Sequence, residues 1–184
     1  MVRGSGGALL ILWTIAFLSG PALNQQKSTP VEQFHVRVED YLKLRKTAAS
    51  ELPKPKPTPS AEEIEQRKAL LTSTLAAART GVAQGSIFTP AVAAEFRRLG
   101  KLAMDGADGP RVQKSLKRAE PVQIAVRANQ AYPPAAPLQS MPPTLLMGLP
   151  ELPKELEYRL VGKTLVLRDI EANLIVDFLP EAIP

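Results

Sequence analysis

The first regular pattern after residue 30 is that of an amphipathic helix. One face between residues 31 and 51 carries Val31, Phe34, Val38, Tyr41, Leu42 and, near its end, Arg45. Spacings of three and four match the 3.6-residue turn of an α-helix. Thr29-Pro30 precedes the segment, and Pro is tolerated in a first helical turn. We predict an amphipathic helix over 31–51 whose contact face, Phe34, Tyr41 and Leu42, docks on a partner or on the rest of this chain.

Three more helices are expected in a helical segment at 61–128. Ser60 and Glu63 have the spacing of a capping box, so they open a helix that extends to about Arg79. Its apolar stripe is formed by Ile64, Leu71, Leu75 and Ala78. The next helix begins at Thr89-Pro90, runs to about Met104 and has the apolar line Val92, Phe96, Leu99 and Ala103. A third, short helix begins at Pro110 and runs to about Ala119. Alternating side chains at 122–126 predict a strand after it.

Alternating apolar residues near the C-terminus predict a three-stranded β-meander at 156–184. Its strands are expected at Glu157–Val161, Thr164–Arg168 and Leu174–Leu179. Gly162-Lys163 fits a two-residue type II′ turn, in which Gly takes the first position. Alternation places one set of side chains on a common face: Tyr158, Leu160, Leu165, Leu167, Leu174, Val176 and Phe178. Three short strands need a covering surface, and the helices of 61–119 are the expected cover.

Two proline-rich segments connect these parts. Residues 52–60 alternate Pro with polar residues, which predicts a stiff, extended linker. Residues 129–155 contain seven Pro among 27 residues and no charge before Glu151. We expect this segment to be an extended strap with its leucines turned inward. The predicted fold class is therefore α+β: a small helical segment packed on a short C-terminal antiparallel β-meander, with a Pro-rich connecting strap and an N-terminal tethered helix.

The beginning of the chain has the pattern of a secretory signal peptide at 1–22. Arg3 is followed by an apolar run of 11 residues, Ala8–Leu18, and then by small or helix-breaking residues. Such a run is too short to cross a bilayer core of about 30 Å as a helix. We predict cleavage after Ala22, with an uncleaved anchor as the alternative. The polar residues 23–30 that follow are expected to be disordered.

The amino-acid composition excludes several kinds of metal and catalytic sites. The chain of 184 residues has no Cys, one His and 18 Pro, with a formal net charge of +5. A disulfide framework, thiolate zinc sites and a cysteine nucleophile are therefore excluded, and so is a site with several His ligands. Absence of Cys in an exported protein favours a bacterial periplasm over eukaryotic secretion. We expect a periplasmic or secreted protein.

The C-terminal sequence carries a resemblance. Residues 152–162 read LPKELEYRLVG, and LVLRD and ANLIVD follow at 165–169 and 172–177. About 30 residues resemble the C-terminal hairpin of small, uncharacterised exported bacterial proteins. They are also loosely similar to the tail of the periplasmic nickel/cobalt-homeostasis family. The resemblance implies an exported bacterial protein with a small sheet. It carries over no metal ligands, because the chain lacks the clusters of His and acidic residues that such a site needs.

Few residues are candidates for a catalytic or metal-binding role. His35 and Glu39 are four apart on one predicted helix, but two ligands do not make a metal site. Asp105 and Asp108 lie in a Gly-rich loop without the ligand pattern of a calcium site. Ser86, Thr89 and Ser115 lack the Gly-x-Ser-x-Gly context of a nucleophile. We therefore assign no catalytic, cofactor-binding or metal residue and expect no cofactor. The carboxylates Glu157, Asp169 and Asp177 keep a carbohydrate-active hydrolase open as an alternative.

Charge is unevenly distributed along the chain. Residues 97–127 contain eight basic and three acidic residues, whereas residues 151–184 contain four basic and seven acidic ones. A basic stripe, formed by Arg111, Lys114, Lys117 and Arg118, is expected to pair with the acidic terminal module. Contact with an anionic membrane or envelope polymer is the alternative, and nucleic acid is not expected in an exported protein.

Taken with the predicted export, these patterns indicate a function without catalysis. We expect an interaction or accessory module of the bacterial envelope that has a protein or cell-envelope partner. The alternatives are the hydrolase and a weak periplasmic metal-binding protein.

Overall fold

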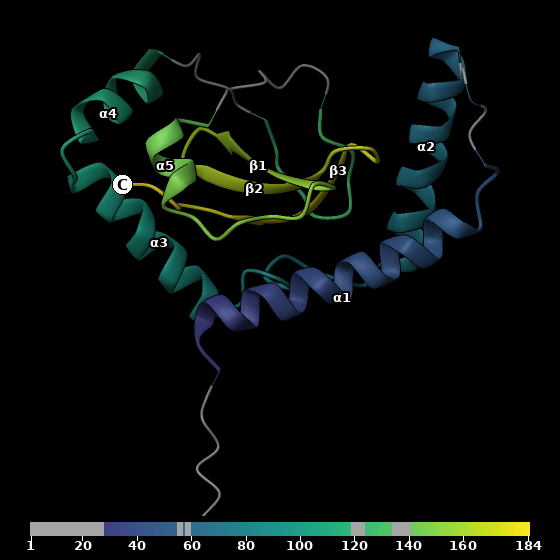
Figure 1. Ribbon diagram of the computed structural model, residues 1–184, viewed down its shortest axis with the longest axis horizontal. Coiled ribbons are helices and arrows are strands. Elements are labelled where there is room, and N and C mark those ends of the chain that lie inside the picture. Colours follow the sequence, from purple (N-terminus) through teal and green to yellow (C-terminus); the bar gives the residue numbers. More distant parts are fainter. Residues whose placement is uncertain (1–27, 55–56, 58–59, 119–123, 134–140) are drawn as a thin grey trace, which may run out of the picture.

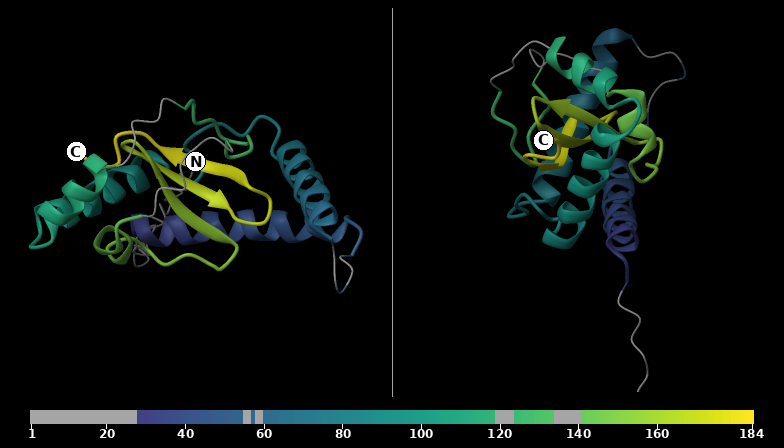
Figure 2. Two further views of the ribbon diagram at one scale, coloured as in Figure 1. Left: turned by 90° about the horizontal axis from the view of Figure 1, so that it is seen from above. Right: turned by 90° about the vertical axis from the view of Figure 1, so that its left-hand side faces the viewer.

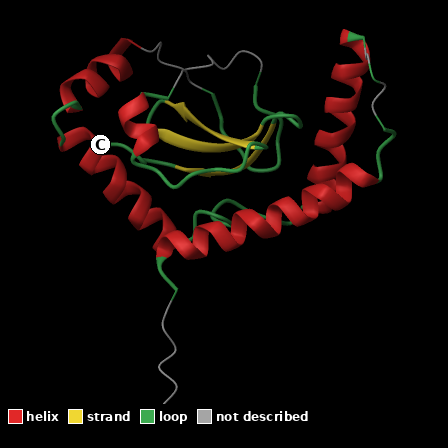
Figure 3. Ribbon diagram, viewed as in Figure 1, coloured by secondary structure: helices red, strands yellow, loops and turns green. Residues whose placement is uncertain are grey.

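The computed structural model describes residues 28–54, 57, 60–118, 124–133 and 141–184, without the side chains of Lys117 and Arg118. Helices and a three-stranded antiparallel sheet follow one another along the chain, which confirms the predicted α+β class (Figure 3). The long helix α1 (Pro30–Ser50) spans the molecule, with α2 (Ala61–Ala78) at one end (Figure 1). Helices α3 (Pro90–Asp105) and α4 (Gly109–Arg118) lie at the other end. No helix among the described residues is long and apolar enough to cross a membrane.

Local signals set the helix ends. Thr29 and Ser60 each cap a helix through a complete capping box, with Glu32 and Glu63 as the returning side chains. Thr89 caps α3, and its hydroxyl accepts a hydrogen bond from the Val92 N–H. These caps satisfy N–H groups that lack a partner in the first helical turn. The N-terminal segment 1–27, including the predicted signal peptide, lies outside the described residues.

The main core joins α1, α3 and one face of the sheet. Strands β1 (Leu156–Val161), β2 (Thr164–Asp169) and β3 (Leu174–Leu179) pair in that order. Four aromatic rings meet where these elements converge, with centroids 4.9–6.4 Å apart: Phe34, Phe88, Phe96 and Tyr158. The first predicted helix therefore docks on its own chain, and Figure 2 shows α1 lying along the sheet.

The hairpin β1–β2 has the expected register, in which Val161 pairs with Thr164 across the turn. Gly162 has a φ of 60°, which the first position of a type II′ turn requires. The pairing of β2 with β3 is interrupted by a bulge, because Leu167 pairs with Asp177 whereas Arg168 pairs with Ile175. The extra residue of a bulge shifts which side chains face the core.

Because of this bulge, the side chains of β3 that face the core differ from the predicted set. Phe178 pairs with Val166 and packs on the outer side of the sheet, away from α1 and α3. Strict alternation predicts Phe178 on the same face as Leu174 and Val176. Asp177 lies on the face that alternation assigns to Phe178: it is fully buried on the helix-covered side. The inserted Val176 is the physical reason for both changes.

Helix α2 covers little of the sheet. Leu71 and Leu75 are its buried apolar side chains, and they meet Ala172 and Leu174 at the end of the sheet. Ile64, which belonged to the predicted stripe, is 51% exposed. The main cover over the sheet is formed by α1 and α3, so the prediction that the helices of 61–119 supply it holds mainly for α3.

The expected strand at 122–126 is not found in its described part, 124–126, and residues 119–123 lie outside the described residues. Residues 129–132 instead run beside β3, where Ala131 forms an isolated bridge to Leu174. The predicted strap is also not extended throughout, since Pro143–Met147 forms the short helix α5. Pro at the start of a helix is favourable, which local sequence reading of a Pro-rich segment overlooked.

Candidate functional site

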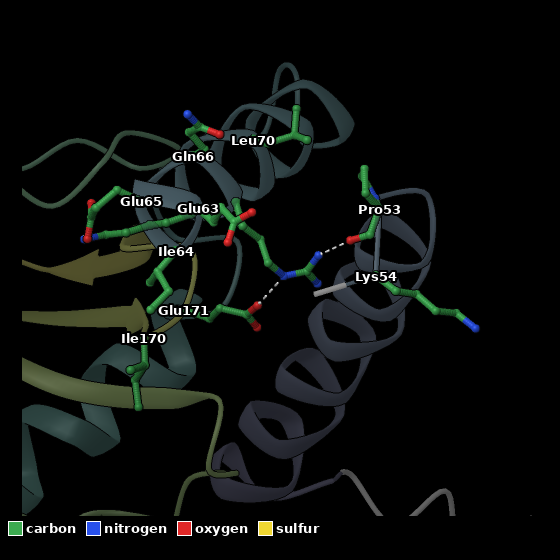
Figure 4. Close-up of a pocket in the computed structure, with 11 residues that line it drawn as sticks. Pro53, Lys54, Glu63, Ile64, Glu65, Gln66, Leu70, Ile170 and Glu171 are labelled. Carbon is green, nitrogen blue, oxygen red and sulfur yellow. Dashed lines mark hydrogen bonds and ion pairs between the residues drawn. The ribbon is translucent and has the colours of Figure 1, made fainter. Parts of the chain in front are cut away.

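The described surface is hollowed between α2, the end of α1 and the β2–β3 turn. This groove has a volume of about 640 Å³, and we call it the α2 groove (Figure 4). It is lined by Pro53, Lys54, Glu63, Ile64, Glu65, Gln66, Arg67, Lys68, Leu70, Ile170 and Glu171. Ile64, Leu70 and Ile170 are 51%, 45% and 44% exposed. The groove thus presents three branched apolar side chains to its opening.

A chain of ion pairs holds the groove in shape. Glu171 of the β2–β3 turn accepts hydrogen bonds from Arg45 at 2.7 Å and from Arg67 at 3.3 Å. Arg67 also donates to the carbonyl of Pro53 at 2.6 Å, which ties α2 to the segment that follows α1 (Figure 4). Arg45 was predicted to share the apolar face of α1, and that position turns its guanidinium toward the sheet. Arg45, Arg67 and Glu171 form what we call the charged clamp.

The charged clamp continues into a buried carboxylate. Asp169 has no exposed surface, and its Oδ2 accepts hydrogen bonds from the Tyr41 hydroxyl at 2.9 Å and the Arg45 Nε at 2.6 Å. Its Oδ1 accepts from the N–H of Ala172 at 2.9 Å and thereby closes the β2–β3 turn. Burial and the neighbouring Asp169 raise the pKa of Tyr41 far above its usual value, so this phenol is a permanent donor.

Asp177 has an equivalent structural role on the same side of the sheet. Its carboxylate accepts hydrogen bonds from the N–H groups of Gly85, Ile87 and Phe88 at 2.8–2.9 Å, which fixes the loop before α3. Arg79 donates to the carbonyl of Val176 at 2.7 Å, and burial lowers the pKa of Arg79.

The third candidate carboxylate lies on the outer face of the sheet. Glu157 is paired with Arg159 at 2.7 Å and with Arg168, and Arg168 also donates to the side chain of Asn173. Burial opposes ionisation of Glu157, but the hydrogen bonds from the two arginines hold its pKa below the usual value. Glu157 is therefore ionised at neutral pH.

Two of the three carboxylates proposed for hydrolysis are closed to a substrate in this arrangement. Asp169 and Asp177 are wholly buried, and donors of this chain already bind both oxygens of each carboxylate. Glu157 is on the opposite face of the sheet from both. None of the three lines the α2 groove. A pair of carboxyl groups facing each other across a cleft, as glycosidases use, is not formed by these residues.

The other candidate residues, His35, Glu39, Asp105 and Asp108, do not form a site either. His35 is half-buried on α1 with its ring against Phe34 at 5.6 Å, while Glu39 is exposed four residues later. Asp105 pairs with Lys101 and Asp108 with Arg111. Within the described part of the chain, no three His, Asp or Glu side chains are grouped so that they could hold a metal ion.

The basic stripe of α4 does not pair with the terminal module among the described side chains. Arg111 pairs with Asp108, which directly precedes α4, and its side chain is 86% exposed. Three acidic residues of the terminal module, Glu157, Asp169 and Glu171, pair with arginines of α1, α2 and the sheet instead. Lys117 and Arg118 are outside the described side chains.

The α2 groove could not be predicted from the sequence. Ile170 and Glu171 are a hundred residues from Ile64 and Arg67, so no local pattern joins them. One signal was available: Ile64 and Leu70 are large apolar residues on a capped helix whose other stripe, Leu71 and Leu75, suffices for its packing. No family model, curated protein or solved structure matches this sequence.

Proposed function

We propose that this protein is an exported module of the bacterial envelope that acts by binding another protein, without catalysis. The α2 groove is the binding site in this proposal. The observation that carries it is the exposure of Ile64, Leu70 and Ile170 around one concave surface. Exposed apolar side chains grouped in a groove are typical of interaction sites, because their burial by a partner is favourable.

The charges around the groove suggest the kind of partner. Three basic and three acidic residues line it, so its net charge is zero. Glu171 is already bound by Arg45 and Arg67, and Lys68 pairs with Glu65 at 3.2 Å. A strongly charged partner would have to break these pairs without a compensating gain. The occupant we propose is therefore an uncharged apolar segment of an envelope protein.

A comparison of matched variants tests the binding site. The tagged mature protein is used to capture partners from a bacterial envelope extract, beside Ile64→Asp, Ile170→Asp and Leu102→Asp. Leu102 on α3 is 55% exposed and remote from the groove, so it controls for adding a charge at an exposed leucine. We expect one protein to be retained by the wild type and Leu102→Asp and lost by both groove variants. Equal capture by all four proteins would refute the groove as the site.

Export has its own test. The predicted signal peptide, cleaved after Ala22, would leave a mature chain that begins at Leu23. The full chain is expressed in a bacterium, and N-terminal sequencing is applied to the protein from each cell fraction. We expect the sequence LNQQK in the periplasmic or secreted fraction. A chain that begins at Met1 in the cytosol would exclude export.

A further inference from the structure

The outer face of the sheet carries a second hollow, distinct from the α2 groove. Its apolar cluster is formed by Tyr132, Val161, Val166 and Ile175, with Ile124, Val126 and Phe178 packed against it. An open cleft of about 590 Å³ borders this cluster and is lined by Ile124, Ala125, Val126, Val161, Thr164, Phe178 and Pro180. A volume of this size is within the range of small-molecule sites.

A positively charged group of side chains adjoins the cleft. Arg159 and Arg168 share a single carboxylate, that of Glu157. The guanidinium of Arg168 lies over the ring of Tyr132, with its Cζ 5.4 Å from the ring centroid. One excess positive charge therefore remains in a region where most of each side chain is shielded from water.

Two hydrogen-bond donors in this group lack a partner. The Tyr132 hydroxyl and the Arg159 Nε are both buried and make no hydrogen bond within the described part of the chain. Burial raises the pKa of Tyr132, so its hydroxyl stays protonated at neutral pH. Buried donors without an acceptor are rare in folded proteins because they lose their hydration without compensation. Two of them beside an excess positive charge call for an anionic acceptor.

The two donors do not line the cleft but neighbour residues that do. Tyr132 packs in the same cluster as Val161 and Phe178, which form part of the cleft wall. Arg159 precedes Val161 by two residues in β1, and alternate residues of a strand project from the same face about 6–7 Å apart. One fifth of the Arg159 side chain is exposed, whereas its Nε and the Tyr132 hydroxyl are buried, so a ligand reaches these two donors only when the side chains turn outward.

We propose that this face binds a small carboxylate with an apolar body, of the class of medium-chain fatty acids. Its carboxylate accepts hydrogen bonds from the Tyr132 hydroxyl and the Arg159 guanidinium, and its alkyl chain lies in the cleft against Val161 and Phe178. Guanidinium is the preferred partner of carboxylates in partly buried sites. The site is separate from the α2 groove, and its test is independent of the proposed partner protein.

Calorimetry of the mature protein with sodium decanoate tests the proposal. Butyrate supplies the same head without the apolar body, and decyltrimethylammonium supplies the same chain with the opposite charge. We expect binding of decanoate, with affinity at least about tenfold weaker for the two other compounds. Absence of decanoate binding, or equal binding of the ammonium compound, would overturn the assignment.

Variants locate the site. Tyr132→Phe removes only the unpartnered hydroxyl, so the thermal unfolding temperature without ligand should stay the same or rise. Decanoate affinity should fall about tenfold, because one hydrogen bond to the ionised head is lost. Tyr158→Phe is the matched control, since its hydroxyl donates to the Pro150 carbonyl on the other face. Unchanged affinity in Tyr132→Phe, or an equal loss in Tyr158→Phe, would contradict the site.

Discussion

The two ends of the molecule are held together by different forces. Around α3, aromatic and aliphatic side chains from α1, α3 and the sheet form a continuous apolar core. Around α2, the apolar contact is reduced to a small cluster centred on Leu71 and Leu75, and the charged clamp adds polar bonds. Burial of apolar surface is the larger stabilising term in proteins, whereas exposed ion pairs contribute about 0–1 kcal/mol each.

This difference has a functional meaning. An element that is bound by few apolar contacts leaves its remaining apolar side chains available to a partner, as Ile64 and Leu70 are. The directional bonds of the charged clamp can position α2 without covering it. The α3 end also exposes single apolar side chains such as Leu102, but at the α2 end the exposed ones, Ile64, Leu70 and Ile170, line one groove.

The largest expected effect is in the apolar core. Phe96 is 1% exposed and contacts the rings of Phe34, Phe88 and Tyr158. Phe96→Ala should lower the free energy of unfolding by about 3–5 kcal/mol, measured by urea denaturation. Leu102→Ala in the same helix should cost less than about 0.5 kcal/mol because Leu102 is already exposed. Similar losses in the two variants would mean that the aromatic cluster is not the main core.

A smaller effect is expected where the charged clamp enters the sheet. All three partners of Asp169, from Tyr41, Arg45 and Ala172, are donors. Asp169→Asn therefore sets an NH₂ group against a donor and removes the charge opposite Arg45. We expect a loss of about 2–3 kcal/mol in urea denaturation.

The control for this variant is Glu171→Gln, which changes a half-exposed member of the same ion-pair chain. Its cost should stay below about 1 kcal/mol. Equal losses of unfolding free energy in the two variants would contradict the idea that burial makes the bonds of Asp169 more stabilising than those of Glu171.

Local patterns predicted the elements of both ends well. The capping boxes, the Gly162 turn and the helical spacing in α1 each involve residues fewer than five apart, so they are visible without tertiary structure. The position of Arg45 on an apolar face was such a signal too, and its partner Asp169 proved to be buried. The α+β class followed from these elements.

What could not be predicted depends on distant residues. Burial of Asp177 results from a bulge opposite Leu167, and its partners in the loop at 85–88 are about ninety residues away. Strict alternation places Asp177 on the face opposite Val176 and Phe178. The α2 groove likewise needs α2 and the β2–β3 turn to meet, and neither segment alone contains a motif for that contact.

Hydrogen exchange can sharpen the contrast between the ends. Arg67→Gln removes the link from α2 to Glu171 and Pro53, so local opening of α2 should become easier by about 1 kcal/mol. Mass spectrometry should then show amide exchange about fivefold faster over 61–78 and unchanged exchange in α3. Lys68→Gln is the control, because Lys68 pairs only with Glu65 of its own helix. Faster exchange in α3 as well would contradict independent opening of the α2 end.

The smallest expected effect is a pH dependence of the unfolding free energy. It arises from Glu157 on the outer face of the sheet, which is part of neither the α2 end nor the α3 end. In the folded protein, burial on the outer face raises the pKa of Glu157, but its two arginines outweigh this effect and hold the pKa below the ordinary value of 4.5. A carboxylate with a lowered folded pKa stabilises the protein above the unfolded pKa, and this contribution is lost as the pH falls through the folded pKa. Wild type should thus exceed Glu157→Gln in unfolding free energy by about 0.5 kcal/mol at pH 7, with the gap closing below about pH 4.5. The measurement is urea denaturation of both proteins from pH 7 to pH 3. A gap that stays constant over this range would show that the variant acts through packing and not through the charge of Glu157.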